Sequence, residues 1–89
     1  SSFVPLSRLP PQYPYRAAQR GIEGWVRVAF DVTETGSVEH VEIIDSEPPG
    51  VFDKAAIRAV SRWRFKPRMV NGKAVAGKAT QVVDFKLEK

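Results

Sequence analysis

Hydrophobic and polar residues alternate along three stretches of the chain, which is the pattern of a β-strand that buries one of its two faces. The longest stretch covers residues 23–33. Its apolar side holds Val26, Val28, Phe30 and Val32. The last stretch, residues 80–87, reads TQVVDFKL and places Gln81, Val83, Phe85 and Leu87 on one side. We predict a strand over each of these ranges.

The third stretch lies between the other two, over residues 38–45, and follows a glycine-containing turn, ETGS. A short turn of this kind joins two strands into an antiparallel hairpin. Val41 and Ile43 share the apolar side of this stretch, but Val38 falls out of step with them. We therefore expect a β-bulge near Ser37–Glu39, because one extra residue restores the alternation.

Two other segments have helical spacing. Residues 14–20, PYRAAQR, begin with Pro14, which suits the first position of a helix, and Gly21 follows where a left-handed cap is expected. Residues 51–63 carry an apolar stripe, made of Phe52, Ala56, Ala59, Val60 and Trp63. The opposite side of this second helix carries Lys54, Arg58, Ser61 and Arg62.

The ends of the second helix follow from its flanking residues. We expect Gly50 as its N-cap and Pro67 as the residue that ends the element. Asn71–Gly72 then predicts a tight turn before the last strand.

Together these elements predict an α+β fold, with two helices packed on one face of a three-stranded antiparallel sheet. The hairpin makes the first two strands antiparallel, and the second helix carries the chain across to the third strand. Such a crossover leaves the third strand parallel to the second, and therefore antiparallel to the first. The simplest placement sets the third strand beside the first, which gives the strand order 2-1-3.

In this order the third strand has a neighbour on one side only. Open strand edges are usually protected by charge or proline, because they pair readily with other chains. Lys78, Asp84 and Lys86 supply some charge, but residues 80–83 carry none. We therefore expect this edge to accept a guest strand.

Composition narrows the alternatives. The chain has 89 residues, which favours one domain, and it has no cysteine, so no disulfide or thiolate metal site is available. We expect residues 1–11, rich in proline, to be an extended remnant of a linker, and residues 12–89 to form the domain. The formal net charge of +4 would suit an acidic partner, but mixed basic and acidic residues favour an ordinary solvated surface.

No catalytic or metal-binding pattern is present in the sequence. His40 is the single histidine, and with Glu42 it makes a poor metal site. The serines have no base nearby in the predicted fold, so we expect neither an enzyme nor a cofactor. The basic and aromatic run RWRFKPR, residues 62–68, leaves a nucleic-acid-binding module open as an alternative. Its aromatic residues belong to the predicted core, so nucleic acid is not the expected partner.

Several motifs occur together in a characteristic order. They are QYP at residues 12–14, EGWVRVAFDV at 23–32, a turn at Gly36–Val38, FDKAAIRAV at 52–60 and WRFKP at 63–67. In this order and spacing, over roughly residues 10–87, the chain resembles the TonB C-terminal domain family of Gram-negative bacteria. The segment SEPPG, residues 46–50, departs from the shorter serine-rich turn of many relatives.

The resemblance implies a non-catalytic, periplasmic domain of an energy-transducing protein with an inner-membrane anchor that lies outside this sequence. Such a domain binds the TonB box of outer-membrane transporters as an added strand, and the intact protein docks with the ExbB–ExbD complex. The residues that correspond to the guest-binding strand are Thr80, Gln81, Val82, Val83, Asp84 and Phe85. Gln12 corresponds to a residue beside the guest, with Tyr13 and Pro14 shaping its loop.

Two further alternatives stay open at this point. A TonB-like adaptor for another envelope machine would use the same edge with a different partner strand. A homodimer would pair the open edge with a second copy of itself.

Overall fold

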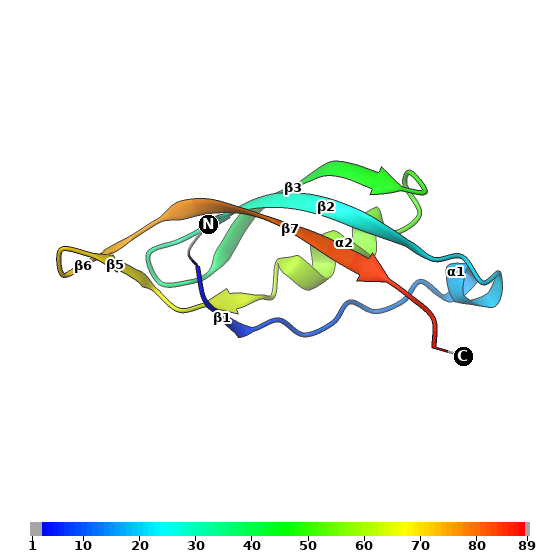
Figure 1. Cartoon of the computed structure of the whole chain (residues 1–89), viewed down its shortest axis with the longest axis horizontal. Helices are drawn as coiled ribbons and strands as arrows, with labels where there is room; N and C mark the ends of the chain where they lie inside the picture. The colour runs from blue at the N-terminus through cyan, green and yellow to red at the C-terminus, as the bar shows by residue number, and fades with distance from the viewer. Residues whose placement is uncertain (1–2, 89) are drawn as a thin grey trace.

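The computed structural model describes residues 3–88, which form an elongated molecule with extents of 50 × 23 × 16 Å (Figure 1). The elements are β1 (Pro5–Ser7), α1 (Tyr15–Gln19), β2 (Gly24–Val32), β3 (Val38–Glu47), α2 (Asp53–Val60), β4 (Arg64–Phe65), β5 (Arg68–Val70), β6 (Lys73–Val75) and β7 (Gly77–Phe85). No helix in residues 3–88 is long and apolar enough to cross a membrane.

The fold is α+β with antiparallel sheets. The three predicted strands correspond to β2, β3 and β7, which form one sheet in the order β3-β2-β7. The predicted sheet was incomplete, because the structure has two further strand pairs, β1-β4 and β5-β6. These four strands are two or three residues long, too short to show an alternating pattern. The β5-β6 hairpin turns at Asn71–Gly72, as predicted, with both residues at positive φ.

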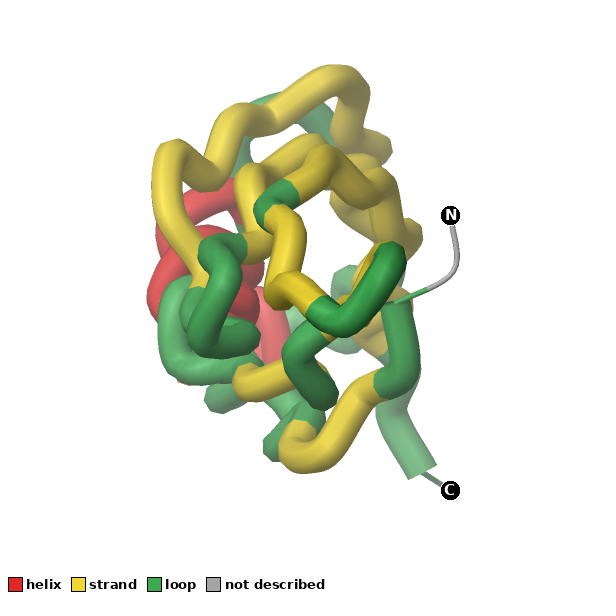
Figure 2. The backbone as a smooth tube through the Cα atoms, turned by 90° about the vertical axis from the view of Figure 1, so that its left-hand side faces the viewer, coloured by secondary structure: helices red, strands yellow, loops and turns green. Residues whose placement is uncertain are grey.

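The core lies between the inner face of the sheet and α2, and Figure 2 shows the helices on one side of the strands. The predicted apolar side of β2 is buried throughout. Phe52, just before α2, stacks on Phe85 of β7 with ring centroids 4.4 Å apart. Leu87 was predicted to belong to the last strand, but β7 ends at Phe85 and Leu87 is half-buried beyond it. Its backbone N–H donates to the Glu23 carboxylate at 2.6 Å.

The second helix is shorter than predicted. It begins at Asp53 with Phe52, not Gly50, at the N-cap position, and it ends at Val60, well before Pro67. The N–H of Trp63 donates to the Val60 carbonyl at 3.0 Å, which tightens the exit from the helix. The early end lets Trp63 and Phe65 turn into the core, where both are buried, and lets β4 pair with β1.

The first helix lies at one end of the molecule, beside the start of β2, and not flat on the sheet as predicted (Figure 1). It spans five residues and buries only Ala17. Pro14 occupies the N-cap position with an extended backbone, one residue before its predicted place. The C-terminus agrees with the prediction: Gly21 has a φ of +67°, and Ile22 donates to the Ala17 carbonyl at 2.9 Å. This is a Schellman cap.

Two bulges interrupt the pairing of β3 with β2. One extra β3 residue lies between the partners of Ala29 and Asp31, and another between the partners of Arg27 and Val28. His40, at the first bulge, has a φ of +54°. The predicted bulge near Ser37–Glu39 was placed slightly early. Val38 and Glu39 still pair with Val32 and Asp31, so the extra residue falls after Glu39 and before Glu42.

The segment before α1 is extended, has no helix and lies against the domain. Residues 1–2 of the predicted linker are outside the described residues, as is residue 89. Within the rest, β1 pairs with β4, and the Trp63 indole N–H donates to the Leu9 carbonyl at 3.1 Å. The Phe3 ring meets the Phe65 ring edge-on, with 6.2 Å between ring centroids. Phe3 also lies over Gly77, and a Cβ added to Gly77 would be 2.8 Å from the Phe3 ring.

Candidate functional site

The outer edge of β7 is the most regular open strand edge of the molecule. Nine consecutive pairs, from Gly24↔Phe85 to Val32↔Gly77, join β7 to β2 without a bulge. In residues 3–88 no strand pairs with the opposite side of β7. Alternate peptide groups of β7 therefore present donors and acceptors away from β2.

The other edge of the same sheet is less suitable for a guest strand. β3 is interrupted by its two bulges, and His40 holds a left-handed backbone there. Its exposed residues include the acidic Glu39, Glu42, Asp45 and Glu47. Bulges and charge are the usual protections of an edge strand. β7 has no bulge, so it offers a longer uninterrupted ladder.

The side chains of β7 alternate as the sequence predicted. Val83 and Phe85 are buried and Gln81 is half-buried, whereas Thr80, Val82 and Asp84 are exposed. The buried residues fix the strand in the core, so its edge is held straight without a guest. The Gln81 side chain donates to the Val82 carbonyl at 3.4 Å, which places an amide beside this backbone.

Tyr13 connects the segment before α1 to the end of β7. Its ring meets the rings of Phe52 and Phe85 edge-on, and the distances between ring centroids are 5.5 and 5.8 Å. Its hydroxyl donates to the Ile22 carbonyl and lies 3.5 Å from the Phe85 carbonyl. Burial, together with the negative charge of Glu23, raises the pKa of Tyr13 above its ordinary value. Tyr13 is thus a neutral residue that packs at the end of β7, beside its unpaired edge.

Gln12 and Pro14, the neighbours of Tyr13, are placed differently. Gln12 is exposed, and both residues line a groove between residues 9–15 and α2. The structure therefore brings Tyr13 to β7, while Gln12 and Pro14 face the helix side of the same segment.

That groove has a volume of about 560 Å³. Its charged lining residues are all basic: Lys54 and Arg58 belong to α2, and Arg62 lies in the turn just after it. The sequence already placed them on the polar side of this helix. Its second wall, the proline-rich segment, depends on tertiary structure and was not predicted.

One charged group spans all three strands of the main sheet. The Asp31 carboxylate on β2 contacts Lys78 of β7 and His40 of β3, each at 2.9 Å. Hydrogen bonds from Lys78 and His40 lower the pKa of Asp31, and the bond to Asp31 raises the pKa of Lys78. Sequence reasoning missed this group, because it needs the register of three strands and the His40 bulge. In residues 3–88 no three metal-ligating side chains gather in one place.

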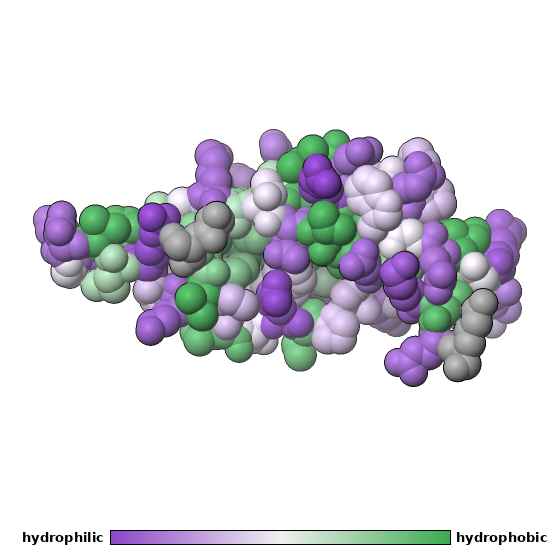
Figure 3. Space-filling view, in the orientation of Figure 1, coloured by the Kyte–Doolittle hydropathy of each residue, from purple (hydrophilic) through white to green (hydrophobic). Residues whose placement is uncertain are grey.

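The remaining surface shows one projecting apolar element. The β5-β6 hairpin extends from the body, and Figure 3 shows hydrophobic surface just behind its hydrophilic end. Met69 and Val70, on β5, are both exposed.

Comparisons with known proteins agree on one family. Residues 10–87 match the family model described as "Gram-negative bacterial TonB protein C-terminal". Protein TonB of Pseudomonas aeruginosa is 43% identical over the whole chain, and Protein TonB of Escherichia coli K12 is 47% identical over 70% of it. The chain spans about a quarter of the length of these curated relatives, 26% of each.

Solved structures show the same likeness. The solution NMR structure of the Pseudomonas aeruginosa TonB C-terminal domain has a TM-score of 0.84 and 43% identity, covering 100% of this chain and 90% of that one. The TonB2 protein of Vibrio anguillarum has a TM-score of 0.72 and 37% identity, covering 97% of this chain and 82% of that one.

Proposed function

The chain belongs to the family of Gram-negative bacterial TonB C-terminal domains, and on this premise we propose that it captures an extended segment of an outer-membrane transporter, the TonB box, as a strand added to β7. The observation that carries the proposal is the uninterrupted, unpaired outer edge of β7 in the described residues. The guest strand would run along Thr80, Gln81, Val82, Val83, Asp84 and Phe85.

Backbone pairing sets the expected strength and selectivity of this contact. Each ladder hydrogen bond contributes about 0.5–1.5 kcal/mol net, so a handful gives an affinity on the order of micromolar. Peptide groups are common to all sequences. One edge therefore serves transporters whose TonB boxes differ in side chains.

The geometry also suits the transmission of force. A pull along the axis of the paired strands loads all ladder hydrogen bonds together, in shear. Within the domain, β7 is joined to β2 along nine pairs, so load on the guest passes into the centre of the sheet. Single-molecule pulling along the strand axis should give a higher rupture force than pulling across it. Equal forces in the two directions would contradict this step.

The rest of the proposed role concerns the intact protein. This domain would work in the periplasm, joined to an inner-membrane anchor and driven by the ExbB–ExbD complex. Gln12, which lies on the groove side of its segment, would hydrogen-bond the guest backbone where the guest runs past the end of β7, with Tyr13 and Pro14 fixing the course of that loop. Self-pairing of two β7 edges in a homodimer would compete with guest binding.

Titration of the ¹⁵N-labelled domain with a TonB-box peptide tests the proposal. We expect amide shifts to concentrate in residues 80–86 and around Gln12. A matched peptide with N-methyl groups at alternate residues should lose binding when the methyl groups face β7, because they remove the ladder donors. Shifts confined to residues 62–68 with an oligonucleotide, and strongly sensitive to salt, would favour the nucleic-acid module instead.

A further inference from the structure

The basic groove beside α2 lies next to one end of the β7 edge, at Tyr13, but no residue of β7 lines it. It is lined by Lys54, Arg58 and Arg62 on one side and by residues 9–15 on the other. No acidic residue lines it. Within the described residues the only ion pairs are those of Asp31, on the sheet, so none of the three cations has a carboxylate partner.

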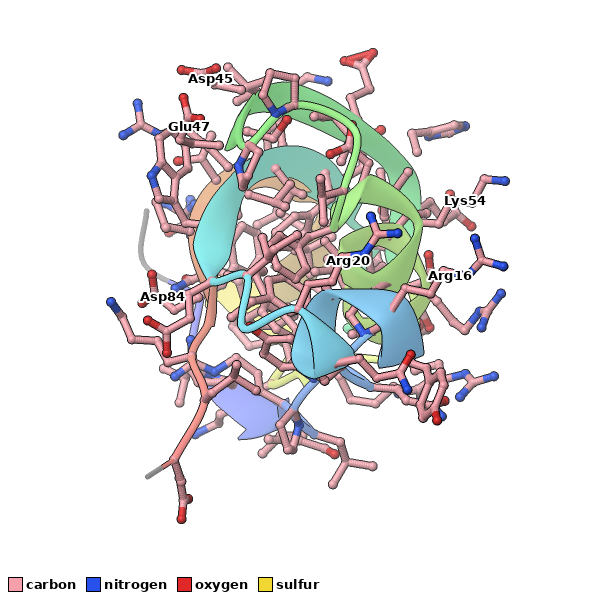
Figure 4. All side chains as sticks on the ribbon, turned by 90° about the vertical axis from the view of Figure 1, so that its right-hand side faces the viewer. Arg16, Arg20, Asp45, Glu47, Lys54 and Asp84 are labelled. Carbon is pink, nitrogen blue, oxygen red and sulfur yellow. The ribbon has the colours of Figure 1, made fainter. Side chains whose placement is uncertain are left out.

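Several charged residues at this end of the molecule are also arranged by sign. Figure 4 shows the labelled Arg16 of α1, Arg20 just after it and Lys54 of α2 on the helical side of the molecule. Asp45, Glu47 and Asp84, which belong to β3 and β7, lie on the opposite side. The field at the groove is therefore positive and attracts an anionic partner.

The spacing of the cations selects the form of that partner. Lys54 and Arg58 lie four residues apart on α2, which is a rise of about 6 Å, and Arg62 follows after four more residues, in the turn beyond the end of α2. Alternate residues of a β-extended chain are about 6.6 Å apart and point to the same side. Three acidic side chains at alternate positions of an extended peptide thus meet the three cations in turn.

The groove wall and floor favour a peptide over other polyanions. Ala55 and Ala59 leave room beside the α2 backbone, and Pro10 and Pro11 give the facing wall an extended shape. Single-stranded nucleic acid needs aromatic rings on which bases stack. Tyr13 is packed against Phe52 and Phe85, and only Tyr15 is exposed.

We infer that this groove is a second docking site, for an extended protein segment that carries acidic residues at alternate positions. The site differs from strand addition at β7, because its contacts are ion pairs with the side chains of Lys54, Arg58 and Arg62 and not backbone hydrogen bonds. It gives the domain two binding sites. One binds its partner through backbone hydrogen bonds, and the other through ion pairs.

The test uses the whole 89-residue chain and three synthetic peptides of equal length. One has the sequence Asp-Thr-Asp-Thr-Asp, which favours an extended chain, one places the same three aspartates together, and one replaces them with asparagine. We expect the alternating peptide to shift amides of residues 54–62, and to bind on the order of threefold more tightly than the contiguous one and at least tenfold more tightly than the neutral one.

A triple variant, Lys54→Gln, Arg58→Gln and Arg62→Gln, should lower the affinity for the alternating peptide on the order of 10-fold. The matched control, Arg27→Gln, Lys73→Gln and Lys86→Gln, removes the same charge from exposed positions elsewhere and should change it less than twofold. Both variants keep the fold if their amide spectra stay dispersed, since every altered side chain is exposed.

Four results would overturn the inference. They are equal binding of the alternating and contiguous peptides, equal loss in both triple variants, shifts centred on β7, or tighter binding of an oligonucleotide or polyphosphate to the same residues. Loss of TonB-box binding at β7 with the groove still active would contradict the proposed function and leave this second site standing.

Discussion

The ring of Tyr13 stands edge-on to that of Phe85, with 5.8 Å between centroids, although the two residues lie at opposite ends of the chain. The Tyr13 hydroxyl also donates to the Ile22 carbonyl, just before β2. One side chain thus ties the segment before α1 to the start of the central strand, β2, and to the end of the edge strand, β7. The β7 edge and the groove beside α2 meet at this point.

Tyr13→Phe should lower the free energy of unfolding by about 0.5–1.5 kcal/mol, because it removes one hydrogen bond and keeps the ring contacts. Tyr13→Ala should lower it further, because Phe52 and Phe85 lose their aromatic neighbour. Urea denaturation measures both. Equal stability of the wild type and Tyr13→Ala would show that the connection contributes nothing.

Val82→Pro should abolish TonB-box binding while the domain stays folded, because proline removes a donor from the β7 edge. Successive N–H groups point to opposite sides of a strand, so Gln81→Pro is the matched variant. It should instead break a bond to β2 and lower stability. Normal peptide affinity of folded Val82→Pro, measured by calorimetry, would remove β7 as the site.

Gln12→Ala should weaken peptide binding by about three- to tenfold, the cost of one hydrogen bond, and leave the unfolding curve unchanged because Gln12 is exposed. Gln19→Ala is a suitable control, since Gln19 is exposed and its side chain donates to the exposed Tyr15 hydroxyl at 3.0 Å. If both variants bind alike, Gln12 takes no part in holding the guest.

The Asp31 group predicts a pH dependence of stability. The pKa of Asp31 is lowered in the folded state, so its contribution is present above about pH 4 and is lost as the pH falls through the lowered pKa. The difference in unfolding free energy between the wild type and Asp31→Asn should therefore shrink on acidification. A difference that is constant from pH 7 to pH 2 would contradict the observed pairing.

Gly36→Ala should destabilise the domain by about 1–3 kcal/mol more than Gly50→Ala does. Both glycines have positive φ, so both variants carry similar backbone strain. Only at Gly36 would the new Cβ meet backbone, 1.9 Å from the Phe65 carbonyl oxygen, whereas Gly50 faces open space. Comparing the thermal unfolding of the two variants measures the cost of the contact between the new Cβ at Gly36 and the Phe65 backbone. Similar melting temperatures would mean that the turn before β3 moves away from β4 freely.

Much of the sheet could be predicted from the sequence because β2 and β7 each bury one face, which leaves a period of two along the chain. The break at Val38 was visible for the same reason. The end of α2 was not, since its helical spacing continues to Trp63. The backbone departs at Val60 because Trp63 and Phe65 must reach the core after it.

The candidate site also has one part that the sequence predicts and one part that depends on tertiary structure. The open edge followed from strand order, and the basic side of α2 followed from its spacing. The groove wall at residues 9–15 and the contact of Tyr13 with Phe85 depend on how distant segments meet, which no local pattern records. The short strands β1 and β4 likewise form only because the extended first segment lies against the chain after α2.

Hydrogen exchange along β7, with and without a TonB-box peptide, tests strand addition most directly. In the free domain we expect alternate amides of residues 77–85 to exchange slowly, because they bond to β2, and the intervening amides to exchange fast. The peptide should slow the fast set alone and leave β3 unchanged. Protection that appears along β3, or that shows no alternation along β7, would contradict the account.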